Sequence, residues 1–224
     1  MRFTGSRYAV CKDRMVVVAH CCDRLAVFRR DHFFMSAMSA TACTREAAAA
    51  AIVRKAAPDE HAAIAALLLR ANREFKEALP ARIYDAYLHD LRELAAAAGG
   101  PEFLVAECAG QLVGAVAFYR EAGREGWGLP PEWAGMRALA VDPAARGRGI
   151  GRQLAEACVL RAWRIGRRFL GLHNGAFQQA ARRLYLTMGF VRCPRFDFDV
   201  GDLPDLDLKS ERLAIDAFCL DLKR

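Results

Sequence analysis

The sequence predicts one α/β domain behind an N-terminal extension, and three observations lead to this prediction. Short apolar runs alternate along the chain with longer runs in which apolar residues recur at helical spacing, as expected of helices packed on a sheet. The 224 residues are enough for one sizeable core. Hydrophobic residues make up 54% of the chain and charged residues 26%, which is typical of a globular protein and argues against a disordered one.

The expected elements follow in the order strand, two helices, three strands, helix, strand, helix and two strands. Pro58-Asp59-Glu60 is a helix-start signal, and Gly99-Gly100-Pro101 ends the second helix. Ala109-Gly110 is a tight turn that joins two alternating runs into a hairpin. The predicted strands are 52–56, 103–108, 112–120, 136–141, 168–173, 190–198 and 214–222, and the predicted helices are 58–71, 81–98, 150–166 and 177–188.

Residues 1–50 are predicted to be an extension outside the domain of residues 51–224. An alanine run from Ala47 to Ala51 leads into Ile52, where the domain pattern begins. We therefore expect the head, to about residue 34, to be poorly ordered or to come from a start codon placed too early.

The net charge of the chain is +7, and its distribution bears on the partners to expect. Residues 1–50 hold eight Lys or Arg against four Asp or Glu, a balance of +4. Much of the remaining positive charge lies at Arg146–Arg152, which suits a polyphosphate ligand, and at Arg161–Arg168, which is expected to be a solvated helix face. A nucleic-acid binder working through the basic head is the rival interpretation, but no aromatic residues are interleaved and no reading motif is recognisable, so no nucleic-acid partner is expected.

Neither a membrane span nor an export signal is predicted, so we expect a cytoplasmic protein. A span needs a run of about 18 apolar residues, and the chain has none. The apolar stretch Met15 to Cys22 is closely flanked by charges and is followed by no clear cleavage site.

The chain has eight cysteines, which are predicted to be mostly reduced thiols that behave as small hydrophobic residues. A zinc site can be drawn from residues of the head, but no C-x-x-C pair with a matching partner exists, so no metal is predicted. The residues that such a site would use are Cys11, His20, Cys21, Cys22 and His32.

A glycine-rich turn from Arg146 to Gly151 stands between a predicted strand and a predicted helix. Glycines let backbone N–H groups approach a phosphate, and the first turn of a helix adds unpaired donors and about half a positive charge. A P-loop is excluded because the turn lacks a lysine followed by a hydroxyl residue. The dinucleotide fingerprint is excluded because Arg152 stands where its last glycine should be.

The remaining pattern is R-x-x-G-x-G, filled by Arg146, Gly149 and Gly151, and it resembles the pyrophosphate loop of the GNAT acetyltransferase superfamily. A second stretch, LGLHNGAFQQAARRLYLTMGFVRCP, resembles that family's next conserved region. The two motifs stand in the family's order, and the resemblance extends from about Ile52 to Leu222. It implies an α/β fold with a single GNAT-like domain: a mixed, mostly antiparallel sheet with helices on both faces. The residues of the second stretch that match the family pattern are Asn174, Tyr185, Gly189 and Phe190.

The resemblance also implies a co-substrate, acetyl-CoA, and residues that hold it. The loop would anchor the pyrophosphate, and the backbone of the preceding strand would bind the pantetheine, with a bulge that frees an N–H for the thioester oxygen. Such an oxyanion donor contributes about 3 kcal/mol in well-studied enzymes. The expected cofactor-binding residues are Leu139, Ala140, Val141, Arg146, Gly147, Arg148, Gly149, Ile150, Gly151, Arg152 and Asn174.

Two side chains are the expected catalytic residues, and each has a structural alternative. Tyr185 is expected to be the general acid that protonates the departing thiolate, because a phenol with an ordinary pKa of about 10 keeps its proton at neutral pH; otherwise it is a core tyrosine. Family members often carry a glutamate base near the strand that precedes the loop, where this chain has Arg137, with Glu132 before it. Glu132, His173 and a water relay are the three alternatives for the base.

The sequence therefore predicts an N-acetyltransferase that moves an acetyl group directly from acetyl-CoA to a primary amine on a small molecule or peptide. The rival interpretation is a sensor that binds acetyl-CoA without turnover. The acceptor is expected beside residues 75–87 and the last hairpin, where an acidic loop would suit a cationic amine or simply face solvent. The family resemblance also makes a homodimer an expectation. The acidic residues of the loop are Asp197, Asp199, Asp202, Asp205 and Asp207.

Overall fold

The computed structural model of the chain describes residues 51–97, 99–203 and 211–223. The predicted N-terminal extension, its predicted poor order and the cysteines and histidines of the head lie outside these ranges. Within them, no helix is both long and apolar enough to cross a membrane.

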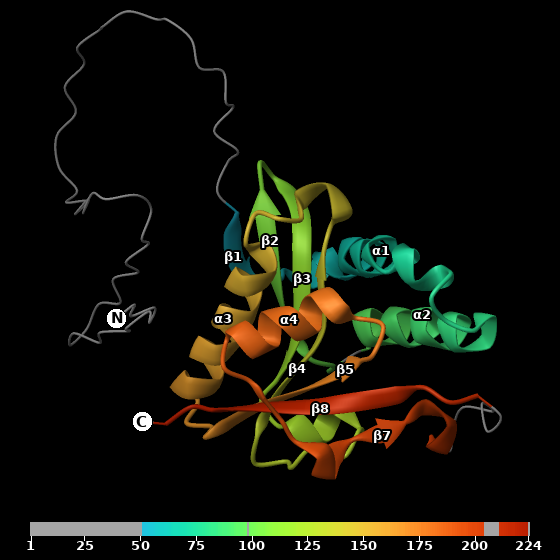
Figure 1. The fold of residues 1–224 in the computed structure, drawn as a ribbon. Helices are drawn as coiled ribbons and strands as arrows, with labels where there is room; N and C mark the ends of the chain where they lie inside the picture. The colour runs from blue at the N-terminus through green and yellow to red at the C-terminus, as the bar shows by residue number, and fades with distance from the viewer. Residues whose placement is uncertain (1–50, 98, 204–210, 224) are drawn as a thin grey trace, which may run out of the picture. The chain divides into compact units, whose positions relative to one another are not determined.

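The described strands form one mixed sheet in the order β1-β2-β3-β4-β5-β8-β6, with β7 paired to β8 (Figure 1). Each pair of neighbours runs antiparallel except β4 and β5, which run parallel. The predicted mixed, mostly antiparallel sheet is thus confirmed. The strands are β1 (Ile52–Lys55), β2 (Glu102–Cys108), β3 (Gln111–Tyr119), β4 (Ala134–Val141), β5 (Phe169–Gly175), β6 (Val191–Arg192), β7 (Phe198–Asp199) and β8 (Ala214–Asp221).

Helices cover both faces of the sheet, as predicted. In Figure 1, α1 and α2 lie on one side of the central strands, and α3 and α4 lie on the other. Short 3-10 turns link the elements, among them η1 (Pro58–Glu60), η2 (Arg73–Lys76), η3 (Ala122–Glu125), η4 (Pro143–Ala145) and η5 (Pro194–Phe196). The helices are α1 (His61–Ala71), α2 (Ala81–Ala96), α3 (Ile150–Arg164) and α4 (Gln179–Thr187).

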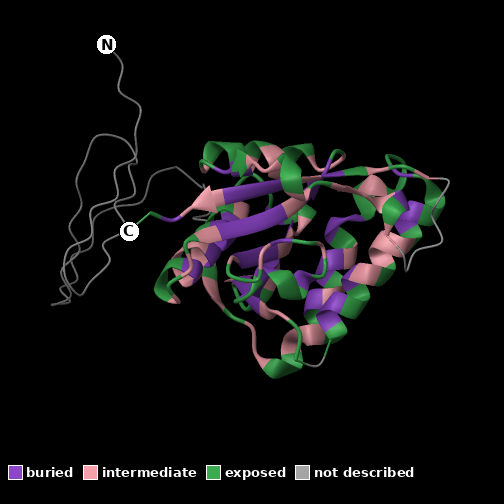
Figure 2. Ribbon diagram, turned by 90° about the horizontal axis from the view of Figure 1, so that it is seen from below, coloured by how far each residue is buried: buried purple, intermediate pink, exposed green. Residues whose placement is uncertain are grey.

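The alternation of side chains along the central strands creates two cores, one on each face of the sheet. Val116 and Phe118 of β3 pack in the cluster that contains the buried residues of α3. Ala115 and Ala117, which point the other way, pack in the cluster of α1 and α2. Figure 2 shows the result: buried residues run along the central strands, and exposed residues lie on the outer surfaces of the helices.

The last part of the sheet differs from the prediction of one strand over residues 190–198. The strand is interrupted after Arg192, because Pro194 begins the 3-10 turn η5, and pairing resumes only at Phe198. Proline has no N–H to give to a ladder, so it favours such a break. Cys193, beside the break, is joined to Cys219 of β8 by a disulfide, whereas the sequence predicted thiols that are mostly reduced.

A charged cluster fastens β1 to the turn before α1. The Arg54 guanidinium donates to Glu60 through Nη1 and Nη2, at 2.7 and 2.6 Å, and to Glu107 through Nε, at 2.8 Å. Glu60 also accepts the Ala57 N–H at 2.6 Å. The bonds from Arg54 and Ala57 together lower the pKa of Glu60 from 4.5 to about 2.

Replacing Glu60 with glutamine should therefore destabilise the protein at neutral pH and lose its effect in acid. A carboxylate whose folded-state pKa is lowered stabilises the fold above its unfolded pKa, and this contribution disappears as the pH falls from about 4.5 to about 2. We expect a loss of about 1 kcal/mol at pH 7, because the pair is partly solvated. Urea unfolding of Glu60→Gln at pH 7 and at pH 3 measures it. The exposed Glu77, changed to glutamine, is the matched control, and an equal loss at both pH values would contradict the prediction.

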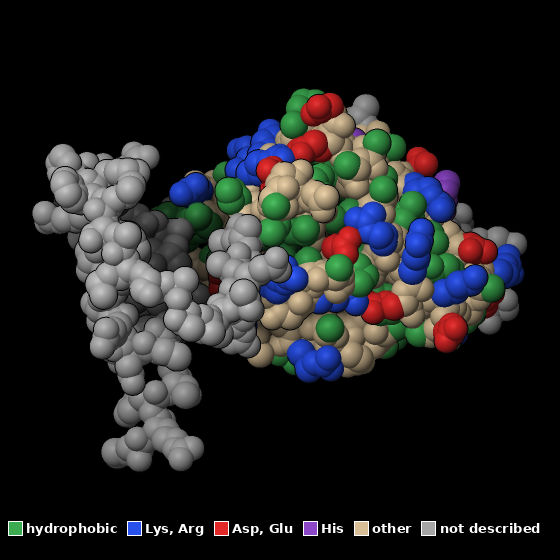
Figure 3. Space-filling model, turned by 90° about the horizontal axis from the view of Figure 1, so that it is seen from above, with side chains coloured by type: hydrophobic (Ala, Val, Ile, Leu, Met, Phe, Trp, Pro, Cys, Tyr) green, Lys and Arg blue, Asp and Glu red, His purple; other side chains and the backbone are tan. Residues whose placement is uncertain are grey.

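Charged side chains of both signs share the surface. On the face shown in Figure 3, Lys and Arg side chains lie among Asp and Glu side chains instead of forming one continuous positive stripe. Arg212 pairs with Asp202 at 2.6 Å, so its charge is compensated locally.

Candidate active site

A bulge in the middle of β4 is the first feature of the site. Ala117 of β3 pairs with Arg137, but Ala115, two residues away, pairs with Ala140, three residues away. β4 therefore contains one extra residue. Ala138 accommodates it with φ of 54°, in the left-handed region, which costs an alanine about 1–2 kcal/mol.

The bulge lies where β4 loses its partner on one side. The parallel ladder between β4 and β5 ends at Gly135 and Gly171, whereas β5 continues to pair with β8 as far as Gly175. From Met136 onward, the β5 side of β4 has no ladder partner among the described residues. Backbone N–H and C=O groups on this side of β4 thus remain unpaired with any described strand at this gap. Because buried backbone groups require hydrogen-bond partners, these groups are available to another molecule.

The glycine-rich turn connects η4 to α3 next to this gap. Gly147 and Gly149 adopt φ of 77° and 79°, and a Cβ atom at either would meet nothing within 4 Å. Glycine is therefore required here by backbone conformation, since space is not limiting. Among the described residues, the N–H groups of residues 147–152 have no backbone acceptor. A row of such donors at the start of a 15-residue helix is suited to a phosphate.

The arginines of this turn differ in what they contact. Arg146 donates to the Glu74 carboxylate at 2.7 Å, to the Ala71 carbonyl at 2.8 Å and to the Val141 carbonyl at 3.2 Å. These bonds tie the turn to the end of α1, to η2 and to the end of β4. The guanidinium of Arg146 is therefore occupied in positioning the turn. Its bonds leave the backbone amides of the turn as the nearest groups that can bind an anion.

Arg152 and Arg148 lie on the other side of the turn. Arg152 donates to the hydroxyl of Thr187 in α4 at 2.8 Å and lies 3.8 Å from Glu156. Arg148 is exposed and has no ion-pair partner among the described residues. Of the three guanidinium groups that the sequence places around the turn, Arg148 is thus the one most available to a ligand.

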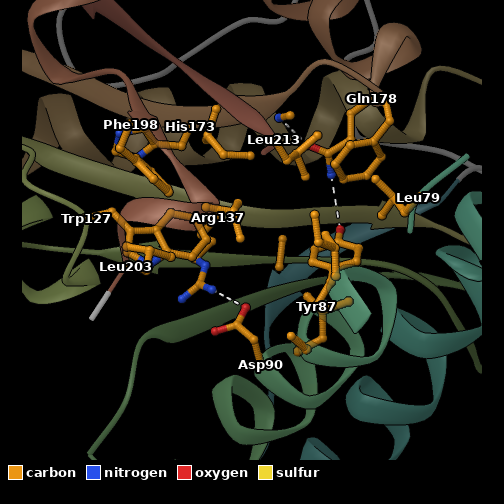
Figure 4. A pocket seen from close by; sticks show the side chains of 18 of the residues that line it. Leu79, Tyr87, Asp90, Trp127, Arg137, His173, Gln178, Phe198, Leu203 and Leu213 are labelled. Atoms are coloured by element: carbon orange, nitrogen blue, oxygen red, sulfur yellow. Dashed lines mark hydrogen bonds and ion pairs between the residues drawn. The ribbon is translucent and has the colours of Figure 1, made fainter. Parts of the chain in front are cut away.

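A pocket of about 430 Å³ opens between β4, α2, α4 and the segment around β7 (Figure 4). Backbone and side chains at the bulge form one wall, including Ala138 and Leu139, and Tyr185 of α4 forms another. Most of the remaining wall is apolar. A hydrogen-bond chain supports it, because Gln178 donates to the Tyr87 hydroxyl at 3.1 Å and Tyr87 donates to Asn72 at 2.9 Å.

One ion pair stands inside the pocket. Arg137 of β4 pairs with Asp90 of α2, and its guanidinium lies 3.7 Å from the centre of the Trp127 ring. Figure 4 shows Arg137 and Asp90 facing each other, with Trp127 beside them. The guanidinium side chain is 10% exposed and the carboxylate side chain 39% exposed. The stacking and the ion pair fix the position of a permanent positive charge in the pocket wall.

Behind this wall lies a second pair of polar groups, Glu125 and His173, whose side chains are both 0% exposed. His173 Nε2 lies 3.0 Å from the Phe196 carbonyl and therefore carries a proton. His173 Nδ1 lies 3.8 Å from a Glu125 oxygen, and neither Nδ1 nor the Glu125 carboxylate has a hydrogen-bond partner in the described structure. Both ring nitrogens of His173 thus face protein, although the ring itself lines the pocket.

These features can be compared with those of known proteins. The family model described as "Acetyltransferase (GNAT) domain" matches residues 99–192, which include the bulge, the glycine-rich turn and Tyr185. Residues 99–192 thus match a GNAT acetyltransferase domain.

Solved structures share the fold of this GNAT domain. An N-acetyltransferase from Staphylococcus aureus Mu50 is 21% identical, covers 77% of this chain and 99% of its own, and gives a TM-score of 0.53. The acetyltransferase of GNAT family from Streptococcus pneumoniae is 19% identical, with coverages of 77% and 99% and a TM-score of 0.52. The structure of yncA from Salmonella typhimurium with its cofactor acetyl-CoA is 19% identical, with coverages of 78% and 95% and a TM-score of 0.52. No curated protein matches the sequence.

The GNAT domain brings most of the predicted site residues to one gap. Leu139 and Tyr185 line the same pocket, and Val141 ends β4 just before the turn that leads into α3. Burial raises the pKa of the Tyr185 phenol, so this group keeps its proton at neutral pH. Its ring packs against Phe190, 5.7 Å away between centres.

Asn174 lies on the opposite face of β5 from His173, because successive side chains of a strand alternate. Its Nδ2 donates to the Gly175 carbonyl at 2.8 Å, but its buried Oδ1 has no partner. A buried acceptor without a donor is uncommon in folded proteins and indicates a missing partner. An amide N–H of a bound ligand would satisfy it.

Glu132 is not brought to the pocket. It precedes β4, is exposed and is absent from the pocket lining, and its carbonyl accepts a bond from Arg167 at 3.2 Å. Its role as base remains a prediction. The sequence reasoning missed Asp90 and Glu125, because one belongs to a helix 47 residues before Arg137 and the other to a loop without a motif.

Proposed function

We propose that the protein is an N-acetyltransferase that moves the acetyl group of acetyl-CoA directly to a primary amine. One observation carries the proposal: a bulged strand whose β5 side is unpaired beyond Gly135, a row of free helix-start amides and a buried tyrosine meet at one gap. Each part matches one need of acetyl transfer, namely a polarised carbonyl, an anchored diphosphate and a proton donor. The GNAT family match and the shared fold of yncA support acetyl-CoA as donor.

The donor would lie along β4 with its diphosphate at the glycine-rich turn. The N–H groups of residues 147–152 would bind the diphosphate oxygens, with Arg148 adding a charge. The backbone of Leu139, Ala140 and Val141 would pair with the pantetheine amides in the way that a neighbouring strand would. The unpaired Oδ1 of Asn174 would accept from an N–H of the same arm.

The transfer itself needs three bond changes. The lone pair of the neutral amine attacks the thioester carbonyl carbon, while N–H groups at the bulge bind the developing oxyanion, an effect worth about 3 kcal/mol per donor. The C–S bond then breaks, and the thiolate takes the proton of the Tyr185 hydroxyl. The resulting tyrosinate regains a proton from solvent or from the amide nitrogen as the site opens.

The amine must lose a proton before it attacks. Asp90 lines the pocket, whereas Glu132 lies outside it. We expect Asp90→Asn to lower kcat/KM at least tenfold, and by more than Glu132→Gln does, in initial-rate measurements with one amine across pH 6 to 9. The reverse order of the two effects would return the base role to Glu132.

The experiment that tests the function combines calorimetry and a thiol-release assay. Coenzyme A should bind the purified protein with one site, and free thiol should appear only when acetyl-CoA and an amine from a wide panel are both present. Mass spectrometry of the product should give a gain of one acetyl group on the amine. Binding without thiol release over the whole panel would identify the chain as the sensor of the rival interpretation, and no binding would overturn the proposal.

A further inference from the structure

The charged pair in the pocket stands in apolar surroundings, which makes it informative about the acceptor. Arg137 and Asp90 line the pocket together with side chains that can bury an apolar group. Aromatic rings also gather there: Trp127 lies 5.3 Å from Phe198 between ring centres. The apolar lining includes Leu79, Ile83, Phe177, Leu203, Leu213 and Ile215.

Arg137 has donors to spare. Asp90 accepts from its Nη2 and is its only ion-pair partner among the described residues, and the Tyr119 hydroxyl also interacts with the guanidinium. An arginine carries five N–H donors in a planar fork, and the Trp127 ring covers one face of this fork without using them. The guanidinium is nine-tenths buried, so water supplies few partners. The N–H donors of the fork that Asp90 and Tyr119 leave unused are therefore available to a planar anion such as a carboxylate.

Asp90 of α2 offers the opposite charge directly beside Arg137. Its side chain is 39% exposed, and only its Oδ2 is engaged by Arg137. The free Oδ1 can bind an ammonium group. The pocket therefore presents a positive and a negative group side by side, and the matching ligand carries the two charges in the reverse arrangement.

The place of Arg137 in the chain sets the distance between these charges in the ligand. Arg137 immediately precedes Ala138, the bulged residue at which the acetyl group would be held. We infer that an amine that attacks at the bulge binds best when its anionic group is only a few bonds away. An amino acid satisfies this requirement, because its amine and carboxylate share one carbon atom.

We propose that the acceptor is a free amino acid with an apolar or aromatic side chain, whose carboxylate binds Arg137 and whose ammonium group first binds Asp90. This proposal rests on the proposed function. A polyamine would bring a second positive charge toward Arg137, and a peptide N-terminus would bring a neutral amide in place of the carboxylate. Both would leave the guanidinium fork unfilled in a pocket from which water is largely excluded.

The test compares two sets of three molecules, and within each set the molecules differ only at the carboxylate. L-Leucine, L-leucinamide and 3-methylbutylamine share one side chain, as do L-phenylalanine, L-phenylalaninamide and 2-phenylethylamine. We expect kcat/KM for the free amino acid to exceed that for the amide and the amine at least thirtyfold in at least one of the two sets. Turnover of the amine or the amide as fast as that of the acid would overturn the proposal and leave the proposed function standing.

Variants of Arg137 give the second measurement. Arg137→Gln should reduce the kcat/KM preference for the amino acid over its amide and amine to less than fivefold, mostly by raising KM for the amino acid. Arg137→Lys, which keeps the charge and loses the fork, should give an intermediate preference. Coenzyme A calorimetry and a melting curve check that each variant is folded. If Arg137→Gln does not fold, the proposal is tested by the wild-type comparison and by Arg137→Lys. An unchanged preference for the acid in a folded variant would overturn the proposal.

A further outcome separates this proposal from the proposed function. A protein that binds coenzyme A and acetylates other amines, but none of the six molecules, would overturn the amino acid proposal and leave the proposed function standing.

Discussion

Changing Tyr185 to phenylalanine should lower the turnover of acetyl transfer about 100-fold while leaving the affinity for coenzyme A almost unchanged. The variant removes one oxygen atom and keeps the ring that packs against Phe190. General acids typically contribute about 10²–10⁴-fold to a rate. Because burial raises the pKa of this phenol, it holds its proton until a thiolate is formed, so the loss should appear at every pH tested between 6 and 9.

Tyr84 provides the matched control for this experiment. It is also a buried tyrosine, but it packs with Leu79 and Ile83 and does not line the pocket. Tyr84→Phe should therefore keep the turnover of the wild type within about twofold. Single-turnover measurements separate the chemical step from product release. Unchanged turnover in Tyr185→Phe would remove the acid role and leave Tyr185 as a core residue.

Changing Gly149 to alanine should weaken the binding of coenzyme A at least tenfold. The residue has φ of 79° at the start of α3, and an added Cβ would meet no atom within 4 Å. The whole effect must therefore come from the backbone, where the left-handed conformation costs alanine about 1–2 kcal/mol. Relief of this strain would turn the N–H groups of the loop away from the diphosphate. Isothermal titration calorimetry with coenzyme A measures the change.

A variant of Gly110 separates the effect of backbone strain on stability from its effect on coenzyme A binding. It has φ of 77° in the turn between β2 and β3, and a Cβ there would also meet nothing within 4 Å. Gly110→Ala should lose as much stability in urea as Gly149→Ala does and bind coenzyme A as the wild type does. Equal losses of affinity in both variants would mean that general destabilisation, not the loop, weakens binding.

The parts of the fold that were predictable are those with strong local signals. The glycine-rich turn and α3 follow from Gly147, Gly149 and the helical spacing after them, since a left-handed glycine and an apolar stripe leave few alternatives. The hairpin of β2 and β3 follows from Ala109 and Gly110, both with positive φ. In these places local propensity and tertiary packing favour the same structure.

The parts that were not predictable depend on contacts between distant residues. The pair of Arg137 and Asp90 requires α2 to pack beside β4, which no local pattern records. The break at Pro194 was visible as a residue without an N–H, but the apolar run around it favoured a continuous strand. The buried Glu125 stands in a glycine-rich loop, where a charged residue is ordinarily solvated, so nothing in the sequence distinguished it.

The extra residue in β4 has a consequence for any attempt to redesign this protein. Before it, the even-numbered Met136 contacts the layer that contains α3, whereas after it the even-numbered Ala140 contacts the layer of α1 and α2. The odd-numbered Leu139 and Val141 then take the α3 side. Within this one strand, the even-numbered side chains thus change from the α3 face of the sheet to the α1 and α2 face, and the odd-numbered side chains change in the opposite direction. A combinatorial library that assumed one parity throughout would place half of its changes in the wrong layer.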